Sequence, residues 1–408
     1  MTAERDFKRF LTVGGIIVAA GVIASAALVA VIDPYRLYGM TEMAGVNQVK
    51  PLPTRYQNQI KMHGALKHQA DTFILGNSRA ELGLNPEHGA LGASAFNLAL
   101  AGTSLGTGRE QLEQLQAAGV KPKRLVVGVE FLDFLLDPSK PLPVREPKEK
   151  GPFDDFAWQA DALFSMDSLS DSLKTLRLQR VSDPQSITAR GFNPLREYNK
   201  FARDDGYYSI FQQRAAENAK RFVRVPRGLV NSETGSSPNS DNLRAILAHG
   251  VRDRADMHLV IYPYHAQILA MFEEAGLAGT FDEWKALLVS EVGKVRAANP
   301  GVRLTLWDFS GFSSYQCEPI PAKGDKKTKT QWYWEAGHFK PALGDIMLSR
   351  VTGASGAAEN FGFALDQSTA VDNRARIARE RAACATAQPE IFEHARELIS
   401  KARGARGM

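Results

Sequence analysis

Cysteine is scarce in this chain, whose 408 residues include only Cys317 and Cys384. This scarcity excludes a disulfide-rich scaffold. The eight histidines are dispersed and show no spacing typical of a zinc site, so we expect no metal centre. Outside the cytoplasm the two thiols can pair, or both can stay reduced and buried, and the sequence leaves the two cases open.

A strong excess of one charge is also absent. The formal net charge is only +5, and the 50 Lys and Arg residues are scattered along the chain. Domains that bind nucleic acid gather basic residues on one face, so we expect no nucleic-acid partner. The apolar and charged contents are those of a globular protein, and the length allows one large domain with insertions or two smaller domains.

One long apolar run is present, and it lies near the N-terminus. Residues 10–32 carry no charge, and a helix of about twenty apolar residues can cross a bilayer. Three basic residues precede the run, namely Arg5, Lys8 and Arg9. The positive-inside rule therefore predicts a cytoplasmic tail over residues 1–9, a single-pass transmembrane anchor over residues 10–32, and a main domain on the periplasmic side of an inner or plasma membrane.

A cleaved signal peptide is the alternative to an anchor. Ala24-Ser25-Ala26 has the small-x-small pattern of a cleavage site. The apolar run continues past this site to Ile32, which is further than a cleavable segment usually extends. We therefore expect the anchor to be retained, with the lipid bilayer as the partner of residues 10–32.

Short apolar runs alternate with helical patterns in the rest of the chain. The runs predicted to be strands are Thr72–Leu75, Ala95–Leu100, Arg124–Val129, Met257–Tyr262 and Arg303–Asp308. Apolar strands separated by helices are typical of a parallel sheet that is covered on both faces. We therefore predict an α/β domain over residues 71–370, with three α/β/α layers around a flavodoxin-like parallel sheet.

Three segments lie outside this alternation. Residues 33–70 are polar, contain proline and end in a helical pattern, which predicts a linker and a first helix. Residues 136–239 are rich in Pro, Arg, Asp and Ser, and we interpret them as an insertion over the strand ends. Residues 371–408 are basic and have helical periodicity, which predicts a helical tail packed on the domain.

Ser78 directly follows the first predicted strand, within Gly76-Asn77-Ser78-Arg79. Functional groups of parallel sheets gather at the carboxyl ends of strands. The glycine permits a sharp turn, and a serine at the start of the next helix lies where backbone N–H groups and the helix dipole can stabilise an oxyanion. A serine at this position can also be a simple helix cap, so the interpretation as a nucleophile requires a base elsewhere.

Glu335 and His338 supply that base, in a turn between the last predicted strand and a helical stretch that begins at Pro341. A serine nucleophile needs a base within hydrogen-bond reach, and a histidine base needs an acceptor that holds its tautomer. A carboxylate three residues before a histidine can provide both functions. The alternative is an exposed loop histidine beside an incidental glutamate.

Other residues at strand ends are candidate oxyanion or substrate contacts: Gly102, Asn97, Arg79 and His265. The main-chain N–H at Gly102 and the Asn97 amide can donate to an oxyanion beside the Ser78 N–H. Gly102 can instead belong to a plain turn. His265 follows the fourth predicted strand, and it can cap a helix rather than face the same pocket.

Together these segments resemble the SGNH (GDSL-like) hydrolases. Gly76-Asn77-Ser78-Arg79 is similar to their first block, in the Gly-x-Ser-Arg form of membrane-anchored bacterial relatives, and Phe96-Asn97-Leu98 with Gly102 resembles the second block. Glu335-x-x-His338 resembles the Asp-x-x-His of the last block, and the residues from His338 to Asp345 are similar to His-Tyr-x-Pro-x-x-Gly. The resemblance covers roughly residues 10–130 and 255–370.

The resemblance implies Ser78 as the nucleophile, His338 as its base, Glu335 as the acid that orients the base, and Gly102 in the oxyanion hole. It implies no cofactor. The implied function is that of an extracytoplasmic serine esterase or O-acyltransferase that acts on acetyl-like esters of a cell-surface or exported polysaccharide. A membrane protein that donates the acyl group is a further partner implied by the resemblance.

Two positions depart from the family pattern. Glu335 replaces the aspartate of the last block, and its longer side chain can still reach the imidazole. The third block, Gly-x-Asn-Asp, should follow the third strand, where the sequence reads Gly128-Val129-Glu130-Phe131 with Asp133 beyond it. An oxyanion hole that lacks one donor loses about 3 kcal/mol of transition-state stabilisation. The alternative function is therefore a catalytically degenerate SGNH-fold protein that binds glycans as an accessory of a polysaccharide assembly complex.

Two other enzyme classes share part of the pattern. Gly102-x-x-x-Gly106-x-Gly108, with Glu130 ending the next strand, mimics the dinucleotide fingerprint of an oxidoreductase, but this class gives Ser78 and His338 no role. Residues 76–80 approach the Gly-x-Ser-x-Gly elbow of the α/β-hydrolases. That elbow normally follows a middle strand rather than the first one.

Overall fold

The computed structural model describes residues 2–142, 154–354, 358 and 360–405. The chain separates into two compact units. The first unit holds residues 1–64 and 145–189, and the second holds residues 65–144 and 190–408. The segment 136–239, which we expected to be one insertion, is therefore divided between the two units.

The first unit begins with the long helix α1 (Thr2–Ile32), whose part Glu4–Ile32 is the one helix of the described residues that is long and apolar enough to cross a membrane. Its most apolar stretch has a mean hydropathy of 2.7, and most of that stretch is exposed. A signal sequence would satisfy the same criteria of length and composition.

The segment after α1 is folded and does not form an extended linker. The buried Asp33 carboxylate accepts hydrogen bonds from the backbone N–H groups of Leu37 and Tyr38, at 2.7 and 3.1 Å. The buried Lys50 ammonium donates to the Ile32 carbonyl at 2.9 Å. Strand β1 (Lys50–Pro51) then pairs antiparallel with β5 (Ser186–Ile187). Helices α5 (Asp154–Phe164) and α6 (Met166–Leu178) pack on α1 within the same unit.

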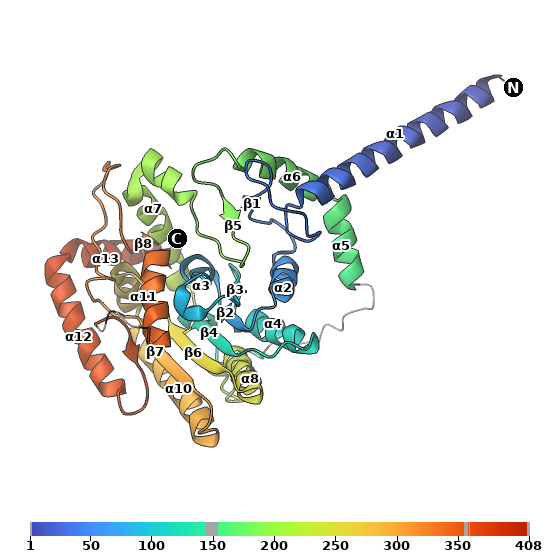
Figure 1. The fold of residues 1–408 in the computed structure, drawn as a ribbon. Coiled ribbons are helices and arrows are strands. Elements are labelled where there is room, and N and C mark those ends of the chain that lie inside the picture. The colour runs from blue at the N-terminus through green and yellow to red at the C-terminus, as the bar shows by residue number, and fades with distance from the viewer. Residues whose placement is uncertain (1, 143–153, 355–357, 359, 406–408) are drawn as a thin grey trace. The chain divides into compact units, whose positions relative to one another are not determined.

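The second unit is built on a mostly parallel six-stranded sheet (Figure 1). Its strands are β2 (Thr72–Leu75), β3 (Ala95–Asn97), β4 (Arg124–Val129), β6 (Asp256–Ile261), β7 (Leu304–Asp308) and β10 (Phe363–Ala364). The spatial order is β10-β7-β6-β4-β2-β3, and β10 is antiparallel to β7. The side chains of β2 are all buried, as expected for a strand covered on both faces. The predicted α/β class is therefore confirmed.

Helices lie on both sides of this sheet (Figure 1). Right-handed crossovers place α4 (Leu105–Ala117), α8 (Pro238–Asp253) and α10 (Ala278–Ala298) on one side, because the three connections that contain them run in the same direction across the sheet. The connection from β2 to β3 runs the other way. It therefore places the short helix α3 (Ser78–Gly83) on the opposite side, where α3 packs with α11 (Pro341–Thr352).

Helix α2 (Gln57–Lys67) crosses the boundary between the units at residue 64. The second unit is completed by the 3-10 turns η1 (Gly89–Leu91) and η2 (Phe131–Phe134), the helices α7 (Tyr198–Phe222), α9 (Ala266–Ala275), α12 (Ala370–Ala387) and α13 (Pro389–Gly404), and the hairpin of β8 (Tyr333–Glu335) and β9 (His338–Phe339). The predicted C-terminal helices are present, and α13 packs on α9 and α7. The strands β8, β9 and β10 were not predicted, because two or three residues carry too little periodicity.

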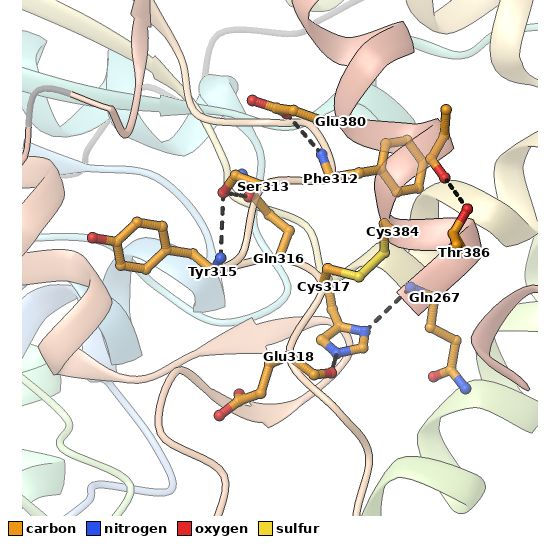
Figure 2. The surroundings of a disulfide bond; sticks show 12 residues. Gln267, Phe312, Ser313, Tyr315, Gln316, Cys317, Glu318, Glu380, Cys384 and Thr386 are labelled. Atoms are coloured by element: carbon orange, nitrogen blue, oxygen red, sulfur yellow. Dashed lines mark hydrogen bonds between the residues drawn. A yellow bond between two sulfur atoms is a disulfide. The ribbon is translucent and has the colours of Figure 1, made fainter. Parts of the chain in front are cut away.

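A disulfide joins Cys317, in the loop after β7, to Cys384 of α12, with the two Cα atoms 5.9 Å apart (Figure 2). One helical turn earlier in α12, the Glu380 carboxylate accepts a hydrogen bond from the Phe312 N–H at 3.1 Å. The open question of cysteine pairing is thus answered in the structure. The bridge also fixes the position of Glu318, the next residue along the chain.

Two glycines allow α3 and α11 to approach closely. A Cβ atom at Gly344 would lie 1.7 Å from the Gly83 carbonyl oxygen, and one at Gly83 would lie 2.0 Å from the Phe339 ring. Any side chain at these positions would therefore force the backbones apart. This contact brings the start of α3 next to β9.

We predict that Gly344→Ala destabilises the protein by about 1–3 kcal/mol and lowers any activity that depends on Ser78, because the added methyl group meets rigid backbone. Gly293→Ala is the matched control, since Gly293 is an exposed helical glycine of α10 with no atom near its Cβ position. That substitution should stabilise by about 0.5–1 kcal/mol. Urea unfolding of the full chain in detergent measures both changes. A Gly344→Ala variant as stable as the parent would contradict the prediction.

Candidate active site

The candidate site lies where the direction of the chain across the sheet reverses, between the carboxyl ends of β2 and β4. Open parallel sheets bind ligands at such points. Gly76 follows β2 with φ +149°, and a Cβ atom there would lie 2.5 Å from the Tyr262 hydroxyl oxygen. A Cβ atom at Gly128, near the end of β4, would lie 1.9 Å from the same oxygen. The Tyr262 hydroxyl thus occupies the space beside both glycines, and neither position can carry a side chain.

Asn77, and not Ser78, is the cap of α3. Its side-chain oxygen accepts a hydrogen bond from the Arg79 N–H at 3.1 Å. Ser78 is therefore the first residue of the helix, and its hydroxyl group is free for another partner. That partner is His338, whose Nε2 lies 2.8 Å from the Ser78 Oγ.

Glu335 completes a hydrogen-bonded series with these two residues. Its Oε1 contacts the Nδ1 of His338, and its Oε2 accepts the Gly337 N–H at 2.7 Å. Glu335 is 1 % exposed. Burial raises the pKa of its carboxyl, but the charge and hydrogen bond of His338, the Gly337 N–H and the charge of Arg79 outweigh burial and lower the pKa overall. An ionised Glu335 holds the proton of His338 on Nδ1 and leaves Nε2 to accept the seryl proton.

The β8–β9 hairpin that carries Glu335 and His338 is held by polar groups from distant segments. The Glu318 carboxylate accepts backbone N–H groups of the strand, including those of Trp332 and Tyr333 at 3.1 Å. The Tyr333 hydroxyl donates to the Pro263 carbonyl at 2.8 Å. Lys340 follows the hairpin, stacks on the Tyr207 and Trp334 rings, and donates to the Tyr207 hydroxyl at 2.9 Å. Burial lowers its pKa to about 8, although Glu318 opposes this shift.

A pocket of about 410 Å³ opens beside Ser78. It is lined by Asn77, Ser78, Arg79, Gly102, Thr103, Ser104, Thr107, Glu130, Asp133 and Arg221. None of these described lining residues has an aliphatic or aromatic side chain. The lining therefore matches a hydrated, hydroxyl-rich ligand better than a long acyl chain.

Gly102 lines this pocket. Its φ of +73° favours glycine. The neighbouring Ala101 N–H is held by the Glu81 carboxylate at 2.8 Å, whereas the Gly102 N–H bonds to none of the described residues. The N–H of Ser78 is one of the donors that a helix leaves unpaired in its first turn. Both groups are therefore available as hydrogen-bond donors at the pocket.

Asn97 and His265 do not reach the pocket, and their prediction as oxyanion or substrate contacts is corrected here. The buried Asn97 amide donates to the carbonyls of Ala80 and Leu84 at 2.9 and 2.8 Å, which secures the end of α3. The fully buried His265 caps α9 through Nδ1, and its Nε2 contacts the Glu318 carbonyl at 2.8 Å. Burial lowers the pKa of His265 to about 4, so the ring is neutral.

Glu130 occupies the place where the third-block Asn was expected, and it is a buried hub. Its carboxylate pairs with the Arg79 guanidinium, accepts the Tyr264 hydroxyl at 3.1 Å and caps η2 through the Leu132 N–H at 3.4 Å. Both oxygens of the Glu130 carboxylate are therefore engaged, which leaves none free to bind the ribose of a dinucleotide. Of the glycines in the dinucleotide-like pattern, Gly108 packs inside α4 against Leu75.

Several residues of the pocket and of the hairpin support were not singled out from the sequence. Thr103 and Ser104 follow Gly102 directly and Thr107 lies in the first turn of α4, so polar residues around the start of a helix were the available signal. Arg221 comes from α7, and no local pattern connects it to Ser78. Glu318 stands alone in an irregular loop, and its role emerges only from the hydrogen bonds it accepts.

No family model matches the chain, and no curated protein is similar to it at a significant level. Among the described residues, no group of three or more His, Cys, Asp or Glu side chains could hold a metal ion.

Asp133 makes the stability of the protein depend on pH. Burial and the charge of Glu130 raise its pKa to about 7, against the attraction of Arg79 and Arg221. The unfolded chain ionises this group at a pH near 4. Between pH 4 and 7 the folded state therefore holds a proton that the unfolded state has lost, and stability falls as the pH rises.

We predict that Asp133→Asn removes this loss. The variant should match the parent at pH 4 and be more stable at pH 8 by roughly 1 kcal/mol or more, since one pKa unit corresponds to about 1.4 kcal/mol. Denaturant unfolding across this pH range measures the difference. The control is Asp282→Asn, at an exposed position of α10. Parallel curves for the parent and Asp133→Asn would refute the prediction.

Proposed function

We propose that this protein is a membrane-anchored, extracytoplasmic serine esterase or O-acyltransferase of the SGNH type. The proposal is carried by the hydrogen-bonded series Glu335–His338–Ser78 beside a polar pocket at the point where the strand order reverses. The order of the five parallel strands, which is 2-1-3-4-5 along the chain, agrees with a flavodoxin-like sheet in a three-layer domain.

In the proposed reaction, the Ser78 Oγ attacks the carbonyl carbon of an ester, and its proton moves to the Nε2 of His338. The carbonyl π electrons move to the oxygen, which becomes an oxyanion beside the N–H groups of Ser78 and Gly102. The oxyanion collapses, the C–O bond to the alcohol breaks, and His338 returns its proton to the departing oxygen. Water or a sugar hydroxyl then attacks the acyl-Ser78 by the same steps, in hydrolysis or transfer respectively.

The lining of the pocket supports a short acyl group on a sugar. A long acyl chain gains about 0.8 kcal/mol for each CH₂ only where apolar walls replace water. The described lining residues offer hydroxyl, carboxyl, guanidinium and backbone groups instead. These groups match the hydroxyls of a glycan, so we propose acetyl-like esters of a cell-surface or exported polysaccharide as substrates. A membrane protein that supplies the acyl group remains the partner expected for transfer.

The proposed location rests on two observations. Helix α1 has the length and hydropathy of a membrane span, and basic residues precede its apolar part. The disulfide of Cys317 and Cys384 is of the kind that persists outside the cytoplasm. Both support an N-terminus in the cytoplasm and a main domain in the periplasm.

We predict that the full chain in detergent hydrolyses p-nitrophenyl acetate, and that Ser78→Ala and His338→Ala abolish this activity. Glu335→Gln should lower kcat about 10²- to 10⁴-fold, because an amide can hold the wrong tautomer of His338. Each variant is checked by its thermal unfolding, and the exposed His68→Ala serves as the histidine control. An inactive parent whose Ser78 is also not labelled by a fluorophosphonate would favour the alternative function, in which the site binds glycans without catalysis.

We also predict a preference for short acyl groups. The kcat/KM should fall about tenfold or more from p-nitrophenyl acetate to p-nitrophenyl hexanoate, because the pocket gives the longer chain no apolar surface. A series of p-nitrophenyl esters at one pH measures this, with hydroxide-catalysed hydrolysis of the same esters as the reference. Equal or rising kcat/KM along the series would contradict the polar character assigned to the acyl site.

A further inference from the structure

The oxyanion site has an unusual third wall. Glu130 stands at the third-block position, where an Asn amide would donate a hydrogen bond, and a carboxylate at that position can only accept. Its Oε2 binds the Nη1 of Arg79, the residue after Ser78. Where an Asn amide would donate a hydrogen bond, Glu130 accepts one instead, and the group that it holds is the guanidinium donor of Arg79.

Arg79 is fixed by its surroundings. Its guanidinium carbon lies 5.1 Å from the centre of the Tyr264 ring and 5.9 Å from that of the Tyr262 ring, so an aromatic side chain and Glu130 together set its plane. Its side chain is 13 % exposed and lines the pocket with Ser78 and Gly102. The charge of Arg79 also acts on the carboxyl of Glu335, which places it within electrostatic reach of the hydrogen-bonded series.

Arg79 has donors to spare. Only its Nη1 donates to a described residue, and the buried Nε has no partner among them. The Nε is closed off from solvent, so a ligand oxygen cannot reach it without a shift of the side chain. Nη2 also donates to none of the described residues and is not closed off, so it is the guanidinium donor open to an oxygen in the pocket. A hydrogen bond from a charged donor to a negatively charged oxygen is stronger than one between neutral groups.

We propose that Arg79 is the third oxyanion donor of this site, held in place by Glu130. The inference rests on the proposed acyl-transfer function. When the Ser78 Oγ adds to the carbonyl carbon and the π electrons move to the oxygen, an N–H group of Arg79 donates to that oxygen together with the N–H groups of Ser78 and Gly102. As the intermediate collapses, the electron pair returns and the hydrogen bond weakens, while the guanidinium keeps all its protons.

The ion pair explains why a positive charge is tolerated there. Glu130 compensates the Arg79 charge before the substrate binds, so the Nη2 donor adds little to ground-state attraction of a neutral ester. It gains strength only as the carbonyl oxygen becomes negative, which is the property that raises kcat. An Arg79 that merely completed a buried ion pair would have no such effect on kcat.

The test compares two double variants in which the buried charge pair is removed as a whole, since a single change would strand a buried charge. Arg79→Ala with Glu130→Ala removes both side chains of the pair and with them the guanidinium donor. Arg79→Ala with Glu130→Asn restores the amide of the third block. Both are assayed with p-nitrophenyl acetate in the full chain, with thermal unfolding to establish folding, beside the parent and Ser78→Ala.

We expect the Ala/Ala variant to lose about 10²- to 10³-fold in kcat at nearly unchanged KM, as for the loss of one oxyanion donor. The Ala/Asn variant should recover at least tenfold of this loss. A folded Ala/Ala variant with kcat within about threefold of the parent, or with a change in KM alone, overturns the proposal. If the Ala/Asn variant is no more active than the Ala/Ala variant, a donor at this wall does not reach the oxyanion, and the proposed geometry is overturned. A parent without Ser78-dependent activity refutes the proposed function itself and is recognised before any Arg79 variant is compared.

Discussion

The close contact of α3 with β9 and α11 is the constraint on which the rest of the site depends. Ser78 and His338 are 260 residues apart, and the elements that carry them, of six and two residues, are too short to be stable alone. The missing side chains at Gly83 and Gly344 let the two backbones meet, and the Phe339 ring fills the remaining space. Asn77 caps the start of α3, while the Asn97 amide secures its end. Packing therefore sets the distance between hydroxyl and imidazole, and the hydrogen bond between them follows from it.

Three carboxyl groups lie near this contact, and their surroundings give each a different state. Burial raises the pKa of Glu335, but His338 and the Gly337 N–H lower it overall, so the Glu335 carboxylate can hold the His338 proton on Nδ1. Glu130 is compensated by Arg79 and accepts the Tyr264 hydroxyl, which makes it part of the wall. Asp133 receives only the longer-range attraction of Arg79 and Arg221 and has a pKa of about 7. The site thus contains the ionised carboxylate of Glu335, the ion pair of Glu130 with Arg79, and the Asp133 carboxyl, which titrates near pH 7.

The sequence predicted what depends on local periodicity and on short motifs. The five parallel strands and the α/β class follow from apolar runs. The juxtaposition of Ser78, Glu335 and His338 follows from short motifs near the ends of predicted strands. Asn97 and His265 were misassigned because a side chain at a strand end can turn inward as easily as outward, and only tertiary contacts decide which. The division of residues 136–239 between two units was missed for a related reason, since composition reveals an interruption but not the surface on which it packs. Arg221 lies on a helix distant in sequence and Glu318 lies in an irregular loop, so no local sequence pattern connects either residue to the site.

The disulfide connects the redox state of the surrounding compartment to the geometry of the hydrogen-bonded series Glu335–His338–Ser78. Cys317 is tied to α12 (Figure 2). The adjacent Glu318 uses its carboxylate to hold three consecutive backbone N–H groups of the segment that leads into β8. Strand β8 ends at Glu335, which lies only a few residues after the N–H groups that Glu318 holds. A displacement of Glu318 would therefore also displace the Glu335 carboxylate. A buried carboxylate that organises a loop needs a fixed backbone, because its desolvation is compensated only while all its donors stay in place. In a reducing compartment this loop would depend on its hydrogen bonds and its packing alone. An oxidising compartment adds a covalent constraint at the residue next to Glu318, which is a physical reason for the hairpin and the bridge to occur together.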